Sequence, residues 1–164
     1  MHTRIIDTHN RKDVRKFINL PFDLYKNCAQ WVPPFISDME LVFNRSKHPF
    51  YQHSEADFIL VESEGQILGR IAVLHNRNYS NYHHQPTAFF YFFDVIEDQQ
   101  VSQSLFQAAF DWAEKRQLKF FYGPRGFLRS SGVGLLVDGF EYKPAIGIPY
   151  NYLLCKIRRK CRLY

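Results

Sequence analysis

The sequence is poor in cysteine and has no long apolar segment. Its 164 residues include only three cysteines, Cys28, Cys155 and Cys161. An odd number at these spacings fits neither a disulfide framework nor a zinc site, and is typical of a reducing compartment. The first residues contain no apolar signal-peptide core. The longest aromatic run, residues 88–93, is far shorter than the about 20 residues that cross a bilayer. We therefore expect a cytoplasmic protein with no membrane partner.

A net positive charge is also lacking over most of the chain. The formal charge at pH 7 is +5, but five basic residues lie in the last nine positions: Lys156, Arg158, Arg159, Lys160 and Arg162. Without them the chain has 16 basic and 16 acidic residues. A domain that binds nucleic acid along a groove normally carries a positive balance over its body. The composition therefore argues against nucleic-acid binding by the body of the chain.

Repeats, low-complexity tracts and flexible linkers are absent as well. What the chain has in abundance is apolar and aromatic side chains, at 46% and 17% of its residues, including 16 Phe and 10 Tyr. This composition excludes a disordered chain, and the aromatic enrichment favours a sheet. At this length we expect one domain, residues 1–152, followed by a basic tail at residues 153–164.

The spacing of apolar residues predicts alternating strands and helices. The expected elements are, in order, an edge strand at residues 5–6, a helix at 13–26 that Pro21 kinks or splits, a short helix at 37–43, a hairpin of strands 57–62 and 66–74, a polar surface loop at 76–86, a strand at 87–96, a helix at 99–116 and a strand at 118–122. The hairpin strands should be antiparallel, whereas the helix before the last strand predicts a parallel pair. The predicted fold class is α/β, with a mixed central sheet and helices on both faces.

This order of elements resembles the GNAT superfamily, the acyl-CoA-dependent N-acyltransferases. More closely, the chain resembles a bacterial family of uncharacterised GNAT-like proteins, which are usually much longer. The stretches that carry this resemblance are residues 17–35, 48–60, 69–76, 89–109, 122–140 and 149–151. The resemblance implies a GNAT-like domain with an acyl-CoA cofactor and a small-molecule amine, or another ligand, as its partner. The two strands that close the sheet in the superfamily are expected to be missing or altered here.

The tail after Asn151 departs from the family pattern. A truncated or frame-shifted end would have this character, and a basic arm for nucleic acid or an anionic membrane is the alternative. Without the closing strands, the strand at 118–122 has an open edge unless something covers it. We therefore expect either a tail strand at residues 152–157 or a homodimer that shares this edge.

In active GNAT proteins a glycine-containing loop before the helix at 99–116 binds the pyrophosphate of acyl-CoA. Unpaired N–H groups at a helix N-terminus attract anions, and glycine lets the backbone approach them closely. The matching positions here contain no glycine, and are Ile96, Glu97, Asp98, Gln99, Gln100, Val101 and Ser102. The two carboxylates would repel phosphates, and Asp98 is expected to cap the helix. The resemblance implies acetyl-CoA or another acyl-CoA as cofactor, and the alternative is a non-catalytic GNAT-like domain that has lost CoA binding.

Acyl transfer to an amine needs a base for the amine proton and a donor for the leaving thiolate. By analogy with GNAT enzymes the candidates are Glu97 or Asp94 for the base, and Tyr150 or Tyr142 for the donor. The alternatives are that the acids cap the helix and that the tyrosines only pack.

A glycine-rich loop follows the last predicted strand, where α/β sheets often bind ligands. Its candidate anion-binding residues are Gly123, Arg125, Gly126, Arg129 and Ser130. Turn formation by the glycines is the alternative explanation. Three histidines, His75, His83 and His84, lie close together in sequence, but we expect no metal site because an adjacent pair does not easily converge on one ion.

Overall fold

A computed structural model describes residues 1–151 of the chain; the predicted tail strand lies outside the described residues. Five strands form one sheet in the order β1-β2-β3-β4-β5. The strands are β1 (His2–Ile5), β2 (Glu55–Ser63), β3 (Gln66–His75), β4 (Thr87–Val95) and β5 (Phe120–Tyr122). The helices are α1 (Arg11–Leu24), α2 (Ile36–Phe43), α3 (Arg77–His83), α4 (Gln99–Glu114) and the short 3-10 helix η1 (Pro49–Gln52). The first three strand pairs are antiparallel and β4–β5 is parallel, which confirms the predicted mixed sheet.

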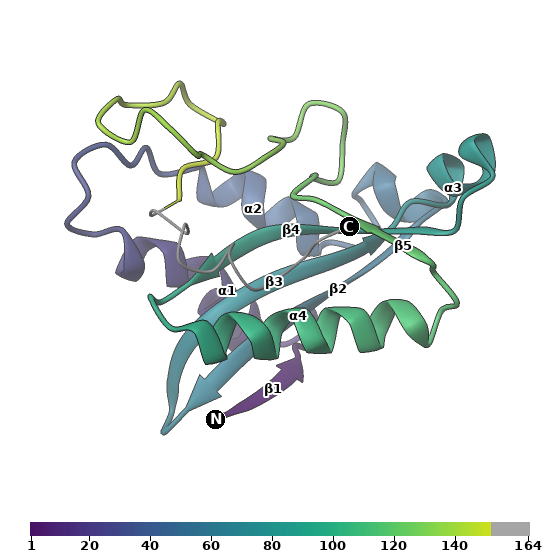
Figure 1. Cartoon of the computed structure of the whole chain (residues 1–164), viewed down its shortest axis with the longest axis horizontal. Coiled ribbons are helices and arrows are strands. Elements are labelled where there is room, and N and C mark those ends of the chain that lie inside the picture. Colours follow the sequence, from purple (N-terminus) through teal and green to yellow (C-terminus); the bar gives the residue numbers. More distant parts are fainter. Residues whose placement is uncertain (152–164) are drawn as a thin grey trace.

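Helices cover both faces of the sheet, as the sequence predicts. Figure 1 shows α4 in front of the sheet, and α1 and α2 behind it. One buried cluster joins α4 to the sheet through Val101, Leu105 and Trp112. A second cluster joins α1 and α2 to the opposite face through Phe17, Met39 and Phe43. Among residues 1–151, no helix is long and apolar enough to cross a membrane.

Pro21 does not split α1, which runs unbroken from Arg11 to Leu24. Proline has no N–H, so the carbonyl four residues earlier, that of Phe17, loses its donor within the helix. The side chain of Arg70 on β3 replaces that donor, with Nη1 2.7 Å from Phe17 O. The helix therefore continues because a neighbouring strand supplies the missing hydrogen bond.

The polar segment 76–86 was expected to be a loop, but its first part forms the short helix α3. Asn76 caps this helix, because its Oδ1 accepts a hydrogen bond from Tyr79 N at 3.0 Å. Tyr79 also packs edge-on against Phe89 of β4, with ring centroids 4.9 Å apart. A local cap and one anchored ring give this segment its helical form, which apolar periodicity does not reveal.

A β-bulge interrupts β4 at Phe92. Arg70 pairs with Asp94, whereas Ala72 pairs with Tyr91, so β4 has one extra residue in this interval. Phe92 takes a positive φ of 48°. Side chains of a regular strand alternate between the two faces, and the extra residue reverses this alternation. The bulge therefore places Asp94 on the α1 face, where it meets Arg70 and Tyr25.

An ion-pair network fastens β1 to β2 and α1, and it predicts a pH dependence of stability. Arg4 donates hydrogen bonds to Asp13 at 2.8 Å and to Glu62 at 2.8 Å. These hydrogen bonds lower the pKa of both carboxyl groups. A carboxyl whose folded pKa is depressed stabilises the protein above its unfolded pKa of about 4. That stability is lost as the pH falls through the folded pKa.

We therefore expect Arg4→Met to weaken the acid dependence of the free energy of unfolding. The measurement is the urea midpoint at pH 7, 4 and 3. The urea midpoint of wild type should decrease from pH 7 to pH 3, and that of the variant should decrease less. Arg11→Met is the control, because Arg11 is exposed and forms no ion pair with the described residues. Equal pH profiles for wild type and Arg4→Met would contradict the assignment.

Candidate functional site

A cavity of about 410 Å³ lies beside the β4 bulge on the α1 face. Its wall includes residues from the 31–34 segment, α2, the bulge, and the long loop after β5, which contributes several residues between 124 and 135 together with residues 147–151. In Figure 1 this loop runs across the top of the molecule beside α2. The lining is largely apolar, with Trp31, Met39, Phe92 and Phe127 among its side chains. The volume lies within the about 300–1,000 Å³ that is typical of small-molecule sites.

A buried charged pair forms the floor of the cavity. Arg70 Nε and Nη2 each lie 2.7 Å from Asp94 Oδ2. The other carboxylate oxygen, Oδ1, accepts a hydrogen bond from the Tyr25 hydroxyl at 2.9 Å. The guanidinium also lies over the rings of Phe17 and Phe92, at 5.0 and 5.1 Å from their centroids. Both charges are thus compensated, so the floor offers a ligand little net charge.

Two further polar side chains reach the cavity wall. His48 is only 4% exposed, and burial lowers the pKa of its imidazole, so the ring is neutral at pH 7. Burial raises the pKa of the Tyr91 hydroxyl, although a hydrogen bond with the Gly132 backbone opposes this effect. Neutral polar groups on an apolar wall suit an uncharged polar part of a ligand.

The N-terminus of α4 is already occupied by a carboxylate of the chain itself. Asp98 caps the helix, as predicted: its Oδ1 accepts hydrogen bonds from Gln100 N at 2.7 Å and Val101 N at 3.4 Å. Ser102 points into the core, where its hydroxyl donates to Gln99 O at 2.9 Å. Two of the backbone donors that could face an anion therefore already have an acceptor.

The predicted catalytic residues do not come together. Tyr150 and Asp94 line the cavity, whereas Glu97 is exposed at the start of α4 and outside the lining. The Tyr150 hydroxyl donates to Phe140 O at 3.3 Å. Tyr142 is 71% exposed. The structure thus brings one candidate tyrosine and one candidate acid to the same cavity, and that acid is bound to Arg70.

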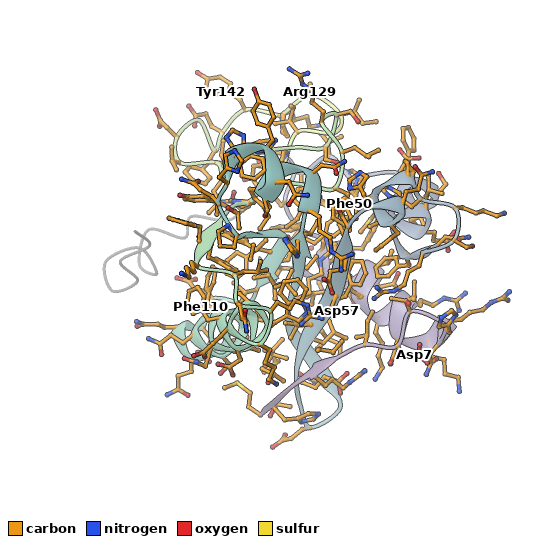
Figure 2. All side chains as sticks on the ribbon, turned by 90° about the vertical axis from the view of Figure 1, so that its right-hand side faces the viewer. Asp7, Phe50, Asp57, Phe110, Arg129 and Tyr142 are labelled. Atoms are coloured by element: carbon orange, nitrogen blue, oxygen red, sulfur yellow. The ribbon has the colours of Figure 1, made fainter. Side chains whose placement is uncertain are left out.

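The residues of the glycine-rich loop are divided between the cavity and other places. Ser130 lines the cavity, and Gly123 packs directly on Phe90 of β4. Arg125 lies over the rings of Tyr79 and Phe89, at 5.1 and 5.3 Å from their centroids. Figure 2 shows Arg129 and Tyr142 pointing outward at the end of the molecule that this loop forms. The two loop arginines therefore do not form one anion site.

Sequence reasoning missed His48 and Arg70 as site residues. Arg70 carried a signal, because it is a charged residue inside the otherwise apolar run at residues 66–74. Buried charges are rare unless they are paired, so such a residue indicates a partner. His48 precedes Pro49 and caps η1, a local role that gives no hint of the cavity. Its position depends on tertiary packing.

Two other features of the described residues do not extend the site. A larger hollow of about 840 Å³ lies between α1 and α2, lined by Arg11, Arg15 and Arg45 among others, but by none of the predicted site residues. No group of three His, Cys, Asp or Glu side chains that could hold a metal ion occurs among residues 1–151. The cavity at the bulge is therefore the candidate site.

Comparisons of the sequence identify two curated relatives. The chain is 30% identical over 151 residues to "Protein YghO" of Escherichia coli (strain K12), which is 87% of this chain and 36% of that protein. It is 27% identical over 147 residues to the "Bacterial ceramide synthase" of Caulobacter vibrioides, 87% of this chain and 37% of that protein. The chain thus spans little more than a third of the length of these relatives. No family model matches it.

The solved structures of similar fold include acetyltransferases and a tandem GNAT protein. A tandem GNAT protein from the clavulanic acid biosynthesis pathway has a TM-score of 0.56 and 17% identity, covering 71% of this chain and 34% of that chain. An aminoglycoside acetyltransferase from an uncultured soil sample has a TM-score of 0.55 and 12% identity, covering 76% and 77%. The ribosomal-protein-alanine N-acetyltransferase of Brucella melitensis has a TM-score of 0.51 and 11% identity, covering 79% and 82%. Identities this low show the fold alone. The described part of the chain has the GNAT fold.

Proposed function

We propose that this chain is the acyltransferase domain of an acyl-CoA-dependent N-acyltransferase whose acceptor is an amine with an apolar chain. The observation that carries the proposal is the apolar cavity at the β4 bulge of a GNAT fold. A β-bulge re-aims side chains and ends regular strand pairing, and bulges are common beside active sites. On the side of β4 that faces β5, the Phe90 carbonyl accepts a hydrogen bond from Arg125 N at 2.8 Å. After Phe90, no described residue forms a backbone hydrogen bond with this side of β4. That free edge could pair with an extended, amide-bearing acyl carrier.

The proposed reaction is a simple acyl transfer. The amine nitrogen attacks the thioester carbonyl, a C–N bond forms and the C–S bond breaks. The amine loses a proton, and the leaving thiolate takes one up. Tyr150, which lines the cavity, is the residue that we assign to the thiolate proton. Glu97 was a candidate for the base that takes the amine proton. Because Glu97 is exposed and lies outside the lining, this proton would have to reach it through solvent.

The nature of the acceptor is supported by both the lining and one relative. Ceramides are amides of fatty acids with long-chain amino alcohols, and one relative is named a bacterial ceramide synthase. An apolar wall with a charge-compensated floor favours such an acceptor over a polycation, which would need unpaired carboxylates. The acceptor that we propose is therefore a long-chain amine.

Acyl transfer is tested directly by incubating the chain with palmitoyl-CoA and dodecylamine. The expected product is N-dodecyl palmitamide, detected by mass spectrometry together with one free thiol per amide. Tyr150→Phe should form the amide at least about tenfold more slowly, since a positioned proton donor typically contributes about 10²–10⁴-fold. If the wild-type chain binds both compounds but forms no amide, the proposal is wrong.

A second candidate is a GNAT-like domain that binds its ligand without catalysis. It is favoured by Asp98, whose carboxylate occupies the α4 N-terminus. Such a domain would retain the cavity but bind no acyl-CoA. The two candidate functions therefore differ in whether acyl-CoA binds near Asp98.

Asp98→Ser separates the two candidates, because serine keeps a helix cap but removes the negative charge. If acyl-CoA phosphates approach α4, we expect this variant to bind palmitoyl-CoA about fivefold more tightly than wild type, as expected for removing a repulsive charge at a helix end. Asp111→Ser, near the opposite end of the same helix, is the matched control. Calorimetric titration gives the affinities. No binding by any of the three proteins at millimolar ligand would favour the non-catalytic domain.

A further inference from the structure

His48 is built into the cavity wall in one fixed orientation. It forms the N-cap of η1, where its Nδ1 accepts a hydrogen bond from Phe50 N at 3.3 Å. Its ring packs edge-on against Tyr51 and Phe127, with centroids 5.9 and 5.8 Å away. The cap and the two aromatic contacts together fix the position of the other ring nitrogen, Nε2.

The tautomer of His48 follows from these contacts. A neutral imidazole has one N–H and one acceptor nitrogen, and since Nδ1 accepts, Nε2 carries the proton. The described residues provide Nε2 with no hydrogen-bond partner. Yet no side-chain nitrogen or oxygen that is fully buried in this part of the chain lacks a partner. Nε2 is therefore not fully buried, and the accessible space that His48 lines is the cavity.

The surroundings of this N–H decide what it can bind. Asp94 and Arg70 neutralise each other, and most of the remaining wall is apolar. An ammonium group has only donors, so it cannot pair with the N–H of a neutral imidazole. A hydroxyl or carbonyl oxygen can accept from it. The position beside His48 therefore suits an oxygen acceptor of a bound amphiphile and does not suit its ammonium group.

We propose that His48 is a specificity-determining residue whose Nε2–H donates a hydrogen bond to the hydroxyl group of a long-chain amino alcohol. This proposal rests on the proposed function, in which the cavity holds the acyl acceptor. The alkyl chain lies along the apolar wall of Trp31, Met39 and Phe127. The domain thereby distinguishes amino alcohols from simple alkylamines.

The test compares two ligands that differ by one hydroxyl group, 1-aminododecan-2-ol and dodecylamine, in calorimetric titrations without acyl-CoA. Wild type should bind the amino alcohol about tenfold more tightly, which is the worth of one hydrogen bond of about 1–1.5 kcal/mol. His48→Asn is the informative variant. Asparagine is a favoured N-cap and still accepts from Phe50 N, but it is too short to replace the Nε2–H donor. It should bind the two ligands with the same affinity.

Three outcomes would overturn the proposal. If His48→Asn keeps the tenfold preference for the amino alcohol, another group binds the hydroxyl. Equal loss of both ligands shows that His48 only supports the fold. If wild type binds neither ligand, the cavity is not an acceptor site and the proposed function is wrong as well. Conversely, a preference that depends on His48, without amide formation in the transfer assay, would uphold this inference while the proposed acyltransferase activity fails.

Discussion

Replacing Arg70 by methionine is expected to lower the free energy of unfolding by about 3–5 kcal/mol, the usual cost of removing one partner from a buried ion pair. The substitution leaves the Asp94 carboxylate at the cavity floor without its cation. It also removes the donor to Phe17 O, the carbonyl that Pro21 leaves without a helical partner. Urea denaturation at pH 7 measures the loss as a shift of the midpoint.

Two further variants show whether the loss comes from the stranded charge. Arg70→Lys keeps a cation but cannot hold the planar contacts to Asp94 and Phe17 O together, so it should lose less than Arg70→Met. The double variant Arg70→Met, Asp94→Leu removes both charges and should recover much of the stability, because apolar replacements of a whole buried pair are often neutral. If Arg70→Met alone had the same urea midpoint as wild type, the ion pair would contribute little to stability.

Gly123→Ala is expected to destabilise the protein by about 3 kcal/mol, at the upper end of what overpacking costs. A Cβ at this position would lie 2.5 Å from Phe90 Cδ1 and 2.7 Å from Phe90 O. The ring is held by stacking on Phe121, with centroids 5.5 Å apart, and the carbonyl belongs to β4. Neither neighbour can move aside cheaply. The chain after β5 would have to separate from β4, which would also open the cavity wall.

Gly134→Ala is the matched control in the same loop. Gly134 has a positive φ of 87°, but nothing lies within 4 Å of a Cβ built there. Its replacement costs only backbone strain, about 1–2 kcal/mol. The unfolding temperature, followed by circular dichroism, should therefore be lower for Gly123→Ala than for Gly134→Ala. The reverse order would mean that the contact between Gly123 and Phe90 yields easily.

Most of the fold could be predicted from the sequence, because its elements carry local signals. The hairpin turn at Gly65, the apolar stripe of α4 and the Asp98 cap all lie where they were expected. The segment that became α3 was different, since Asn76 and one anchored tyrosine decide its form. Pro21 was predicted to kink or split the helix, because the donor that replaces its missing N–H at Phe17 O comes from Arg70, on a strand about fifty residues later.

The candidate site was far less predictable. Tyr150 and Asp94, predicted by analogy with GNAT enzymes, line the cavity, and so does Ser130, predicted from the glycine-rich loop. Glu97 and Arg129 do not. A cavity between a bulged strand, a short helix and a long loop depends on contacts between residues far apart in the chain. His48 shows the limit most clearly, because its cap is local and its cavity-facing nitrogen is a product of packing.

The bulge in β4 also affects how this strand should be aligned with those of other proteins. Up to Tyr91, a residue-by-residue alignment with a regular strand equates side chains on the same face. From Phe92 onward the same alignment equates side chains on opposite faces, so Asp94 is matched with a position that points toward α4. A comparison of β4 with an unbulged strand needs a one-residue gap at Phe92. Without that gap, an acid at the cavity floor would be mistaken for an acid in the core.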